Sequence, residues 1–303
     1  MKKNHPAFSA LKALLTHSSF SALRNSGLSV AVVFALLATG CSKESATILP
    51  KNNLALTVTA ATVAAPGVSA YLGTAAGFTI FAKSSITSTG GATVEGNIVV
   101  ASIVSNALTG FNLTIDPKTK TFSTASNKLT LSGKAYTAAY AAPTPANIKI
   151  ALGFIDTAFS KLSRLKSMPT TVSEGAPVSL DLLYKGNLGG RTLAHGGIYT
   201  AAAGLTISGG TLTLTGTAKD LYIFQIGKAL TVANNVTLIL KGGLTAANIV
   251  WVAGTSANFG TSDNFYGSLV VKTLVSLNAK DNFTGRIYTD GTVTMAGSHV
   301  YLP

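Results

Sequence analysis

Near its end the chain repeats a five-residue motif, Asp-Asn-Phe-x-Gly, at residues 263–267 and again eighteen residues later at 281–285. Similar units, each a short β-branched or apolar run next to a Gly or Asn corner, begin near residues 204, 229, 254, 274 and 292. Intervals of about eighteen to twenty-five residues are typical of solenoid coils rather than of hairpins. The repeat therefore predicts a parallel β-helix, in which coils of two or three short strands stack about 4.8 Å apart.

Composition favours the same all-β architecture. Only 11% of residues are charged, and Gly, Ala, Thr, Ser and β-branched residues dominate, a mixture that suits strands and tight corners. We expect Phe265 and Phe283 to stack on each other inside the solenoid. The other predicted inward residues are Leu212, Leu214, Ile223, Phe224, Leu238, Leu240, Val250, Val252, Leu269, Val271 and Ile287.

One amphipathic helix is predicted between residues 144 and 166. Thr144 is expected as its N-cap and Pro145 as its first helical residue. Basic residues favour the negative end of the helix dipole, and three occur there: Lys161, Arg164 and Lys166. A single apolar stripe recurs at helical spacing, formed by Ile148, Leu152, Ile155, Phe159 and Leu162. One stripe means one buried face, so the helix should lie along the outside of the β-helix.

The first forty residues are typical of an export signal, with scattered basic residues followed by an apolar run at 28–37 that is too short to span a bilayer. Cys41, the only cysteine, follows small residues and resembles the lipidated cysteine of a bacterial lipobox, although Ala38 stands where Leu is usual. We expect an exported lipoprotein of the outer membrane or cell surface, or a secreted protein if Cys41 is not lipidated. Residues 41–69 are expected to form a tether.

The distribution of charged residues along the chain does not indicate a nucleic-acid partner. Without residues 1–40 the chain keeps 19 basic and 10 acidic residues, a formal net charge of +9, and they occur singly along the sequence. A nucleic-acid-binding protein would cluster them. His195 and His299 have no Cys or acidic neighbours at metal-ligand spacing. We therefore expect no metal and no cofactor. Because the predicted helix covers one face and nothing obvious exposes a large apolar patch, we also expect a monomer.

Several further segments carry a family resemblance. They are Leu72–Phe78, Ile86–Gly90, Ala107–Phe111, Ala138–Pro145, Tyr222–Gly227 and Asn248–Gly254. In this order they resemble the microbial ice-binding proteins of the DUF3494 type, and the resemblance covers about residues 70–303. It implies a right-handed, roughly triangular β-helix with a long helix packed alongside, and ice binding through one flat face. One departure is His195, where the family usually has Pro.

Some members of this family display Thr-(Ala/Gly)-x-(Thr/Asn) before a corner, and the corresponding segments here keep that pattern only in part. A flat, preorganised array of hydroxyl and methyl groups can hold ordered water with little ordering cost on binding. The predicted ice-binding residues are Thr93, Thr211, Thr213, Thr237, Asn235, Thr261, Asn264, Ala279 and Asn282. Lys280 and two aspartates lie among these segments, so we expect a moderate ice binder or a face whose charges point to its rim.

Other interpretations of these residues remain open. The Asn and Thr residues can simply form corners, where Asn tolerates left-handed backbone. On adjacent coils, Asp263 and Asp281 could approach the roughly 5–5.5 Å separation of a retaining glycosidase, yet the only Trp, Trp251, lies in an apolar strand rather than on a sugar platform. No other catalytic motif is present, so we expect no enzyme. The main alternative is a lipid-anchored, non-catalytic surface adhesin or structural β-solenoid.

Overall fold

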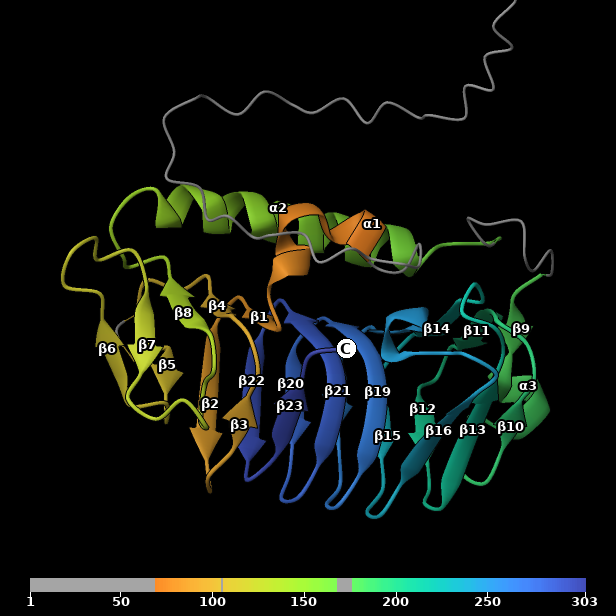
Figure 1. The fold of residues 1–303 in the computed structure, drawn as a ribbon. Helices are drawn as coiled ribbons and strands as arrows, with labels where there is room; N and C mark the ends of the chain where they lie inside the picture. Colours follow the sequence, from red (N-terminus) through yellow and green to blue (C-terminus); the bar gives the residue numbers. More distant parts are fainter. Residues whose placement is uncertain (1–68, 105, 168–175) are drawn as a thin grey trace, which may run out of the picture. The chain divides into compact units, whose positions relative to one another are not determined.

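A computed structural model describes residues 69–104, 106–167 and 176–303. They belong to one compact unit, Pro50–Pro303, and form the predicted right-handed parallel β-helix with one long helix alongside (Figure 1). The predicted signal, Cys41 and nearly all of the predicted tether lie outside the described residues. None of the helices in the described part is both long enough and apolar enough to cross a membrane.

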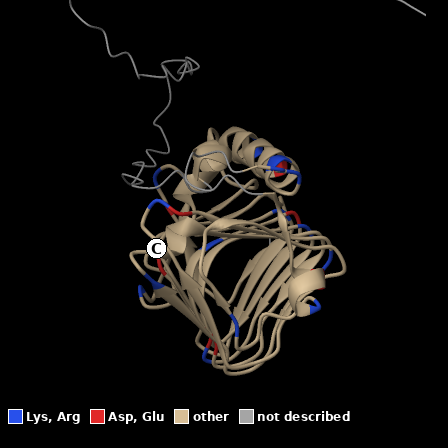
Figure 2. Ribbon diagram, turned by 90° about the vertical axis from the view of Figure 1, so that its right-hand side faces the viewer, with Lys and Arg blue, Asp and Glu red and all other residues tan. Residues whose placement is uncertain are grey.

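Three faces enclose the core of the β-helix, as the view along its axis shows (Figure 2). The first face consists of β9 (Val178–Ser179), β11 (Gly197–Ala201), β14 (Tyr222–Ile226), β17 (Ile249–Ala253), the second halves of β19 (Asn264–Val271) and β21 (Asn282–Thr289), β1 (Ile80–Ala82), β4 (Ile98–Val100) and β8 (Lys134–Thr137). Beyond β8, the antiparallel strands β7 (Ser123–Ala125) and β6 (Leu113–Ile115) close that end.

The second face is a separate seven-stranded sheet. In spatial order it contains β12 (Leu205–Ile207), β15 (Leu230–Val232), β18 (Ser256–Asn258), β20 (Leu274–Leu277), β22 (Thr292–Ala296), β2 (Ser85–Thr89) and β5 (Leu108–Thr109). The third face contains β10 (Thr192–Leu193), β13 (Thr211–Thr215), β16 (Thr237–Lys241), the first residues of β19 and β21, β23 (His299–Tyr301) and β3 (Thr93–Val94). The paired residues Gly267 and Gly285 lie where β19 and β21 pass from the third face to the first.

The spatial order of the coils departs from their order in the sequence. The last coil packs in parallel register against the first described coil, with pairs Ile80↔Ile287, Ile86↔Val293 and Val94↔Val300. The chain then leaves the first coils through the end strands, crosses the solenoid as α2 (Thr144–Leu162), and winds back from the other end. As a result, every face is continuous although its strands come from two distant parts of the chain.

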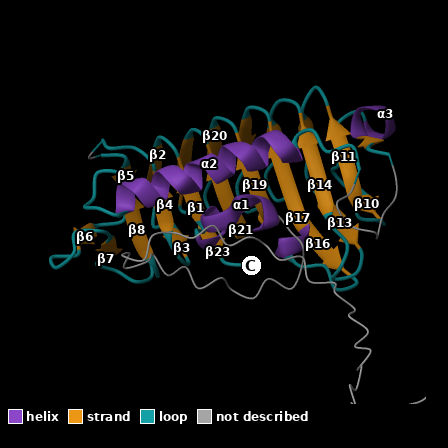
Figure 3. Ribbon diagram, turned by 90° about the horizontal axis from the view of Figure 1, so that it is seen from above, coloured by secondary structure: helices purple, strands orange, loops and turns teal. Residues whose placement is uncertain are grey.

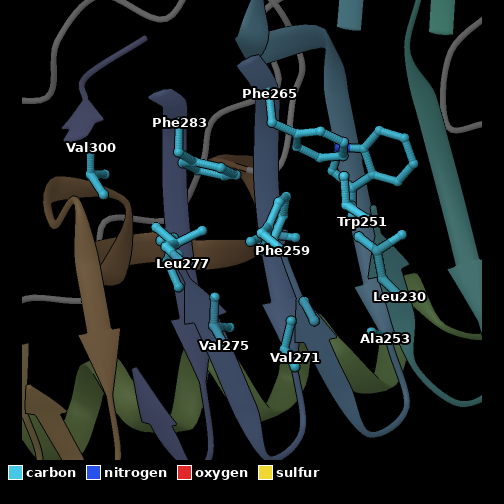
Figure 4. Close-up of a cluster of buried hydrophobic side chains, with 14 of the residues drawn as sticks. Leu230, Trp251, Ala253, Phe259, Phe265, Val271, Val275, Leu277, Phe283 and Val300 are labelled. Atoms are coloured by element: carbon cyan, nitrogen blue, oxygen red, sulfur yellow. The ribbon is translucent and has the colours of Figure 1, made fainter. Parts of the chain in front are cut away.

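Aromatic side chains fill the middle of the solenoid (Figure 4). Phe265 and Phe283 stack as predicted, with ring centroids 6.2 Å apart and an interplanar angle of 19°. Trp251 is fully buried and lies parallel to Phe224 at 3.9 Å. Such stacked, close-packed rings hold the coils in register and leave little freedom for the faces outside them.

The helix α2 covers the first face, together with α1 (Ser69–Leu72) and the short 3-10 helix η1 (Gly73–Gly77) (Figure 3). This arrangement corrects part of the inward prediction, because Ile223, Val250 and Val252 point away from the solenoid interior and pack under α2. Both sides of this face are largely buried, so apolar residues occupy consecutive positions in several of its strands, as in Ile249–Ala253. Leu240, also predicted inward, is only partly buried.

Both ends of α2 differ from the prediction. The N-cap is Pro143, so Thr144 is already helical, and the Thr144 hydroxyl donates a hydrogen bond to the Thr121 carbonyl at 2.8 Å. The helix ends at Leu162, where the side-chain amide of Gln225 donates hydrogen bonds to two carbonyls near the helix terminus. Two short elements complete the fold: α3 (Leu180–Tyr184) and the 3-10 helix η2 (Ala246–Asn248).

Candidate functional site

The third face brings together six of the nine predicted ice-binding residues, five of them in one register. Outward side chains at one register position form a ladder, which we call the third-face ladder: Thr211, Thr237, Asn264, Asn282, His299 and Thr93. Within it, the Asn282 amide donates to the Asn264 amide oxygen at 3.1 Å, and Nδ1 of His299 lies 2.7 Å from the Thr93 hydroxyl. Thr213, also predicted, lies two residues along on the same face. His299 was not predicted as part of this ladder.

The other three predicted residues lie at the corner between the second and third faces. Asn235 has a φ of 61°, and Ser262 and Lys280 on the following coils have φ of 62° and 64°. Thr261 and Ala279 precede these left-handed residues and supply carbonyls to the N–H groups of the coil before. Asn tolerates this backbone better than most residues, so the geometry at Asn235 fits a corner. Lys280 is exposed at this corner, outside the strands of both faces.

Asp263 and Asp281 do not form a catalytic pair open to a substrate, because both are buried, with 0% and 1% exposure. Asp281 accepts hydrogen bonds from the N–H groups of Asp263 at 3.0 Å and Asn278 at 2.7 Å. Asp263 accepts from Val236 at 2.8 Å and Gly260 at 3.0 Å. Burial raises the pKa of both carboxyl groups, that of Asp281 to about 6, while these hydrogen bonds oppose the rise. The pair therefore ties successive corners together.

A longer and more uniform ladder runs across the second face. It links all seven strands at one register position, and we call it the second-face ladder: Thr206, Thr231, Asn258, Ser276, Thr294, Thr87 and Thr109. Each member carries a short hydroxyl or amide side chain and is exposed or half-buried. Neighbours in a ladder are about 4.8 Å apart, so the array extends for about 29 Å. A second row beside it contains Ser256, Leu274, Thr292 and Ser85.

The strands of the second face contain no charged residue and no histidine. The side chains that alternate with the ladder point inward and are buried, among them Ile207, Val275 and Val293. The third face is less uniform, because Lys241 and Glu95 are exposed at its ends and bulky side chains stand beside its ladder, including Tyr266 and Tyr301. A flat, uncharged array of small polar groups is therefore found on the second face.

The prediction from sequence missed the second-face ladder. A signal for it exists, because an apolar–polar–apolar triplet precedes the corner in several coils: Leu205-Thr206-Ile207, Leu230-Thr231-Val232, Val275-Ser276-Leu277 and Val293-Thr294-Met295. One exposed Thr or Ser in a three-residue strand looks ordinary by itself. Only alignment of all coils would have brought the seven residues together.

The described residues hold no group of three or more His, Cys, Asp and Glu side chains that could bind a metal ion. His299 contacts Thr93 and stacks on Tyr301, and the His195 carbonyl accepts a hydrogen bond from the Tyr199 hydroxyl at 2.6 Å. Both histidines thus have structural partners in the β-helix.

A rigid β-helix with long, regular and solvent-exposed polar ladders belongs to the class of proteins that bind extended surfaces. Comparison with known proteins identifies the family. Residues 80–301 match the family described as Ice-binding-like, and the chain belongs to this ice-binding family. It is 32% identical to an ice-binding protein of Flammulina populicola over 77% of this chain and 87% of that protein. It is also 32% identical to an ice-binding protein of a Colwellia species, over 77% and 83% of the two chains.

Solved structures agree on the architecture. An ice-binding protein from an Arctic yeast matches with a TM-score of 0.68 and 27% identity, over 77% of this chain and 93% of that one. A domain of a Shewanella frigidimarina ice-binding protein matches with a TM-score of 0.64 and 24% identity, over 76% and 96%, which shows the shared fold. The family is ice-binding rather than enzymatic in kind.

Proposed function

We propose that this protein adsorbs to ice through the second face of its β-helix and thereby inhibits ice growth and recrystallisation. The observation that carries the proposal is the second-face ladder, seven short polar side chains in register on strands without a charge. Membership of the ice-binding family supports ice as the partner.

The physical argument rests on spacing and rigidity. The ladder repeats about every 4.8 Å across strands and about every 6.6 Å between alternate residues of a strand, distances of the same order as the repeats of an ice surface. Threonine methyl groups and hydroxyls can hold ordered water at these positions. Since the underlying side chains are close-packed, little freedom is lost on binding. Many weak contacts then hold the protein on ice, which can grow only as curved fronts between bound molecules.

The third-face ladder is the second candidate surface, because five predicted residues and an Asn282–Asn264 hydrogen bond lie in one register there. The third face also carries the exposed charged residues Lys241 and Glu95 and tyrosines beside its ladder. These side chains disfavour a flat contact with ice from which liquid water is excluded. Removing the water around a charged group costs a large amount of free energy. We therefore assign ice adsorption to the second face.

Matched tyrosine variants test this assignment. Thr231→Tyr places a bulky ring in the second-face ladder, and Thr211→Tyr places the same ring in the third-face ladder; both threonines are exposed. Thermal hysteresis and ice-crystal shape are measured on the chain from residue 42 to 303. We expect Thr231→Tyr to reduce the freezing-point gap strongly and Thr211→Tyr to leave it near wild type. The reverse pattern would move the ice-binding surface to the third face.

We further propose that the protein is exported, monomeric and anchored by a lipid on Cys41, so that it can hold a cell to ice. A wild-type chain that neither shapes crystals nor lowers the freezing point would make the alternative, a lipid-anchored adhesin on the same scaffold, the better account.

A further inference from the structure

The outer side of α2 is a second surface that ice binding does not use. One side of the helix packs on the first face through Ile148, Ala151, Ile155, Ala158 and Leu162. The opposite side is exposed and carries Lys149 near one end of the helix and Lys161 near the other; Figure 2 colours the basic positions blue and the acidic ones red. Within residues 144–167 the basic residues are Lys149, Lys161, Arg164 and Lys166, all exposed, against one acidic residue.

That acidic residue, Asp156, does not neutralise the basic residues on the outer side of α2. It is only half exposed and lies beside Asp290, which forms an ion pair with Lys272. Burial and the neighbouring Asp290 raise the pKa of Asp156. The Lys272 ammonium also lies over the Phe159 ring, 4.6 Å from its centre. This group of charges is turned toward the solenoid and leaves the outer side of α2 cationic.

Two large apolar side chains lie among the exposed residues of the helix. Ile150 is 45% exposed and Phe154 is 39% exposed, four residues apart and therefore on one side of α2. The Phe154 ring also packs beside Gly73 of η1. Basic residues together with exposed apolar side chains on one helix face are typical of helices that rest on an anionic lipid surface.

The short helix α1 lies beside the same surface. Ser69 opens α1, which packs beside α2 (Figure 3). Twenty-seven residues lie between Cys41, the proposed lipidation site, and Ser69. A chain anchored at Cys41 therefore reaches the β-helix where α1 packs beside α2. The exposed positions of α1 and η1, Ala70, Gly73 and Thr74, are uncharged and do not oppose an anionic surface.

We propose that the outer side of α2 docks on an anionic lipid bilayer, and that this contact leaves the second face free. The faces lie on different sides of the β-helix (Figure 2). Ice adsorption and membrane docking thus use separate surfaces of one rigid body. The tether argument rests on the proposed lipidation of Cys41, whereas the charge argument is independent of it and of ice binding.

Vesicle binding tests the proposal. The unlipidated chain 42–303, which contains the whole compact unit, is sedimented with vesicles of phosphatidylcholine and phosphatidylglycerol in equal amounts, and with pure phosphatidylcholine. The variant Lys149→Gln/Lys161→Gln/Arg164→Gln is compared with the matched variant Lys128→Gln/Lys219→Gln/Lys241→Gln, whose lysines are exposed elsewhere. Each basic residue near an anionic surface is worth about five-fold in partitioning. We expect the α2 variant to lose about a hundred-fold and the control to stay within about three-fold.

Equal losses in the two variants would mean non-specific attraction by net charge and would overturn the proposal, as would equal binding to neutral and anionic vesicles.

A second readout locates the contact. Trp251 is buried in the core, so a tryptophan introduced by Ile150→Trp can report contact with brominated lipids, with Thr206→Trp on the second face as control. We expect quenching of the first only; quenching of the second or of neither contradicts docking through α2. Thermal hysteresis of the same samples reports the ice function separately.

Discussion

Replacement of Asp281 by Asn is expected to remove a loss of stability that the wild-type protein shows as the pH rises from about 4 to about 6. The carboxyl group is buried, and burial raises its pKa from 3.8 to about 6. Between these values the folded protein binds more protons than the unfolded chain, so the free energy of unfolding falls as the pH rises from about 4 to about 6. A shift of about two pKa units corresponds to at most about 3 kcal/mol.

Asn carries no charge at any pH, but its amide nitrogen cannot accept the hydrogen bond that the second carboxyl oxygen of Asp281 takes from a backbone N–H group. We therefore expect Asp281→Asn to lose about 1–3 kcal/mol relative to wild type at pH 4 and to recover about 2 kcal/mol of this difference by pH 7, in urea unfolding followed by the fluorescence of Trp251. The control Asp281→Ala removes both acceptors from the N–H groups of Asp263 and Asn278 and should lose about 2–4 kcal/mol at pH 4. If the difference in stability between Asp281→Asn and wild type is the same at both pH values, the pKa of Asp281 is not raised in the folded protein and the reasoning is refuted.

Two further predictions concern the fold, and a third concerns the proposed lipid anchor. Trp251→Ala removes a buried ring stacked at 3.9 Å on its neighbour and should cost about 3–5 kcal/mol in urea unfolding; a loss below about 1 kcal/mol would contradict the close-packed core. Gly291→Ala would place a Cβ 1.5 Å from the Thr273 carbonyl oxygen and should lower Tm. In α2, the Cβ of Gly153→Ala meets nothing within 4 Å, so this variant should gain about 1 kcal/mol in stability. Equal Tm values for the two variants would contradict the close approach at the Gly291 corner. Cys41→Ser should move the protein from the membrane to the soluble fraction, and retention in the membrane would exclude the lipid anchor.

The repeated motif explains how much of the fold could be predicted. In each copy the Asp side chain bonds backbone N–H groups at the corner, the Asn joins the third-face ladder, the Phe enters the core, and the Gly allows the strand to turn onto the first face. These roles differ in chemistry, so four unlike residues recur at one interval. The coil period, the Phe265–Phe283 stack and the third-face register were therefore readable from the sequence.

Other features depend on contacts that the sequence pattern does not encode. The pairing of the first described coil with the last joins residues more than 200 positions apart, such as Ile80 and Ile287, and no local signal specifies it. Residues such as Val250 lie on a face buried on both sides, where alternation disappears. The second-face ladder was missed because each member is one exposed polar residue in a short strand, which looks ordinary by itself. One of its steps, from Thr294 to Thr87, also crosses this long-range junction.

The central claim is that the second face adsorbs to ice, and uptake of labelled protein into slowly grown ice tests it most directly. The chain 42–303 is compared with Thr231→Tyr/Thr294→Tyr on the second face and Thr211→Tyr/Thr237→Tyr on the third. The account predicts that the wild type and the third-face variant enter the ice, while the second-face variant remains in the liquid. Uptake of the second-face variant at the wild-type level, or exclusion of the wild type, would contradict it.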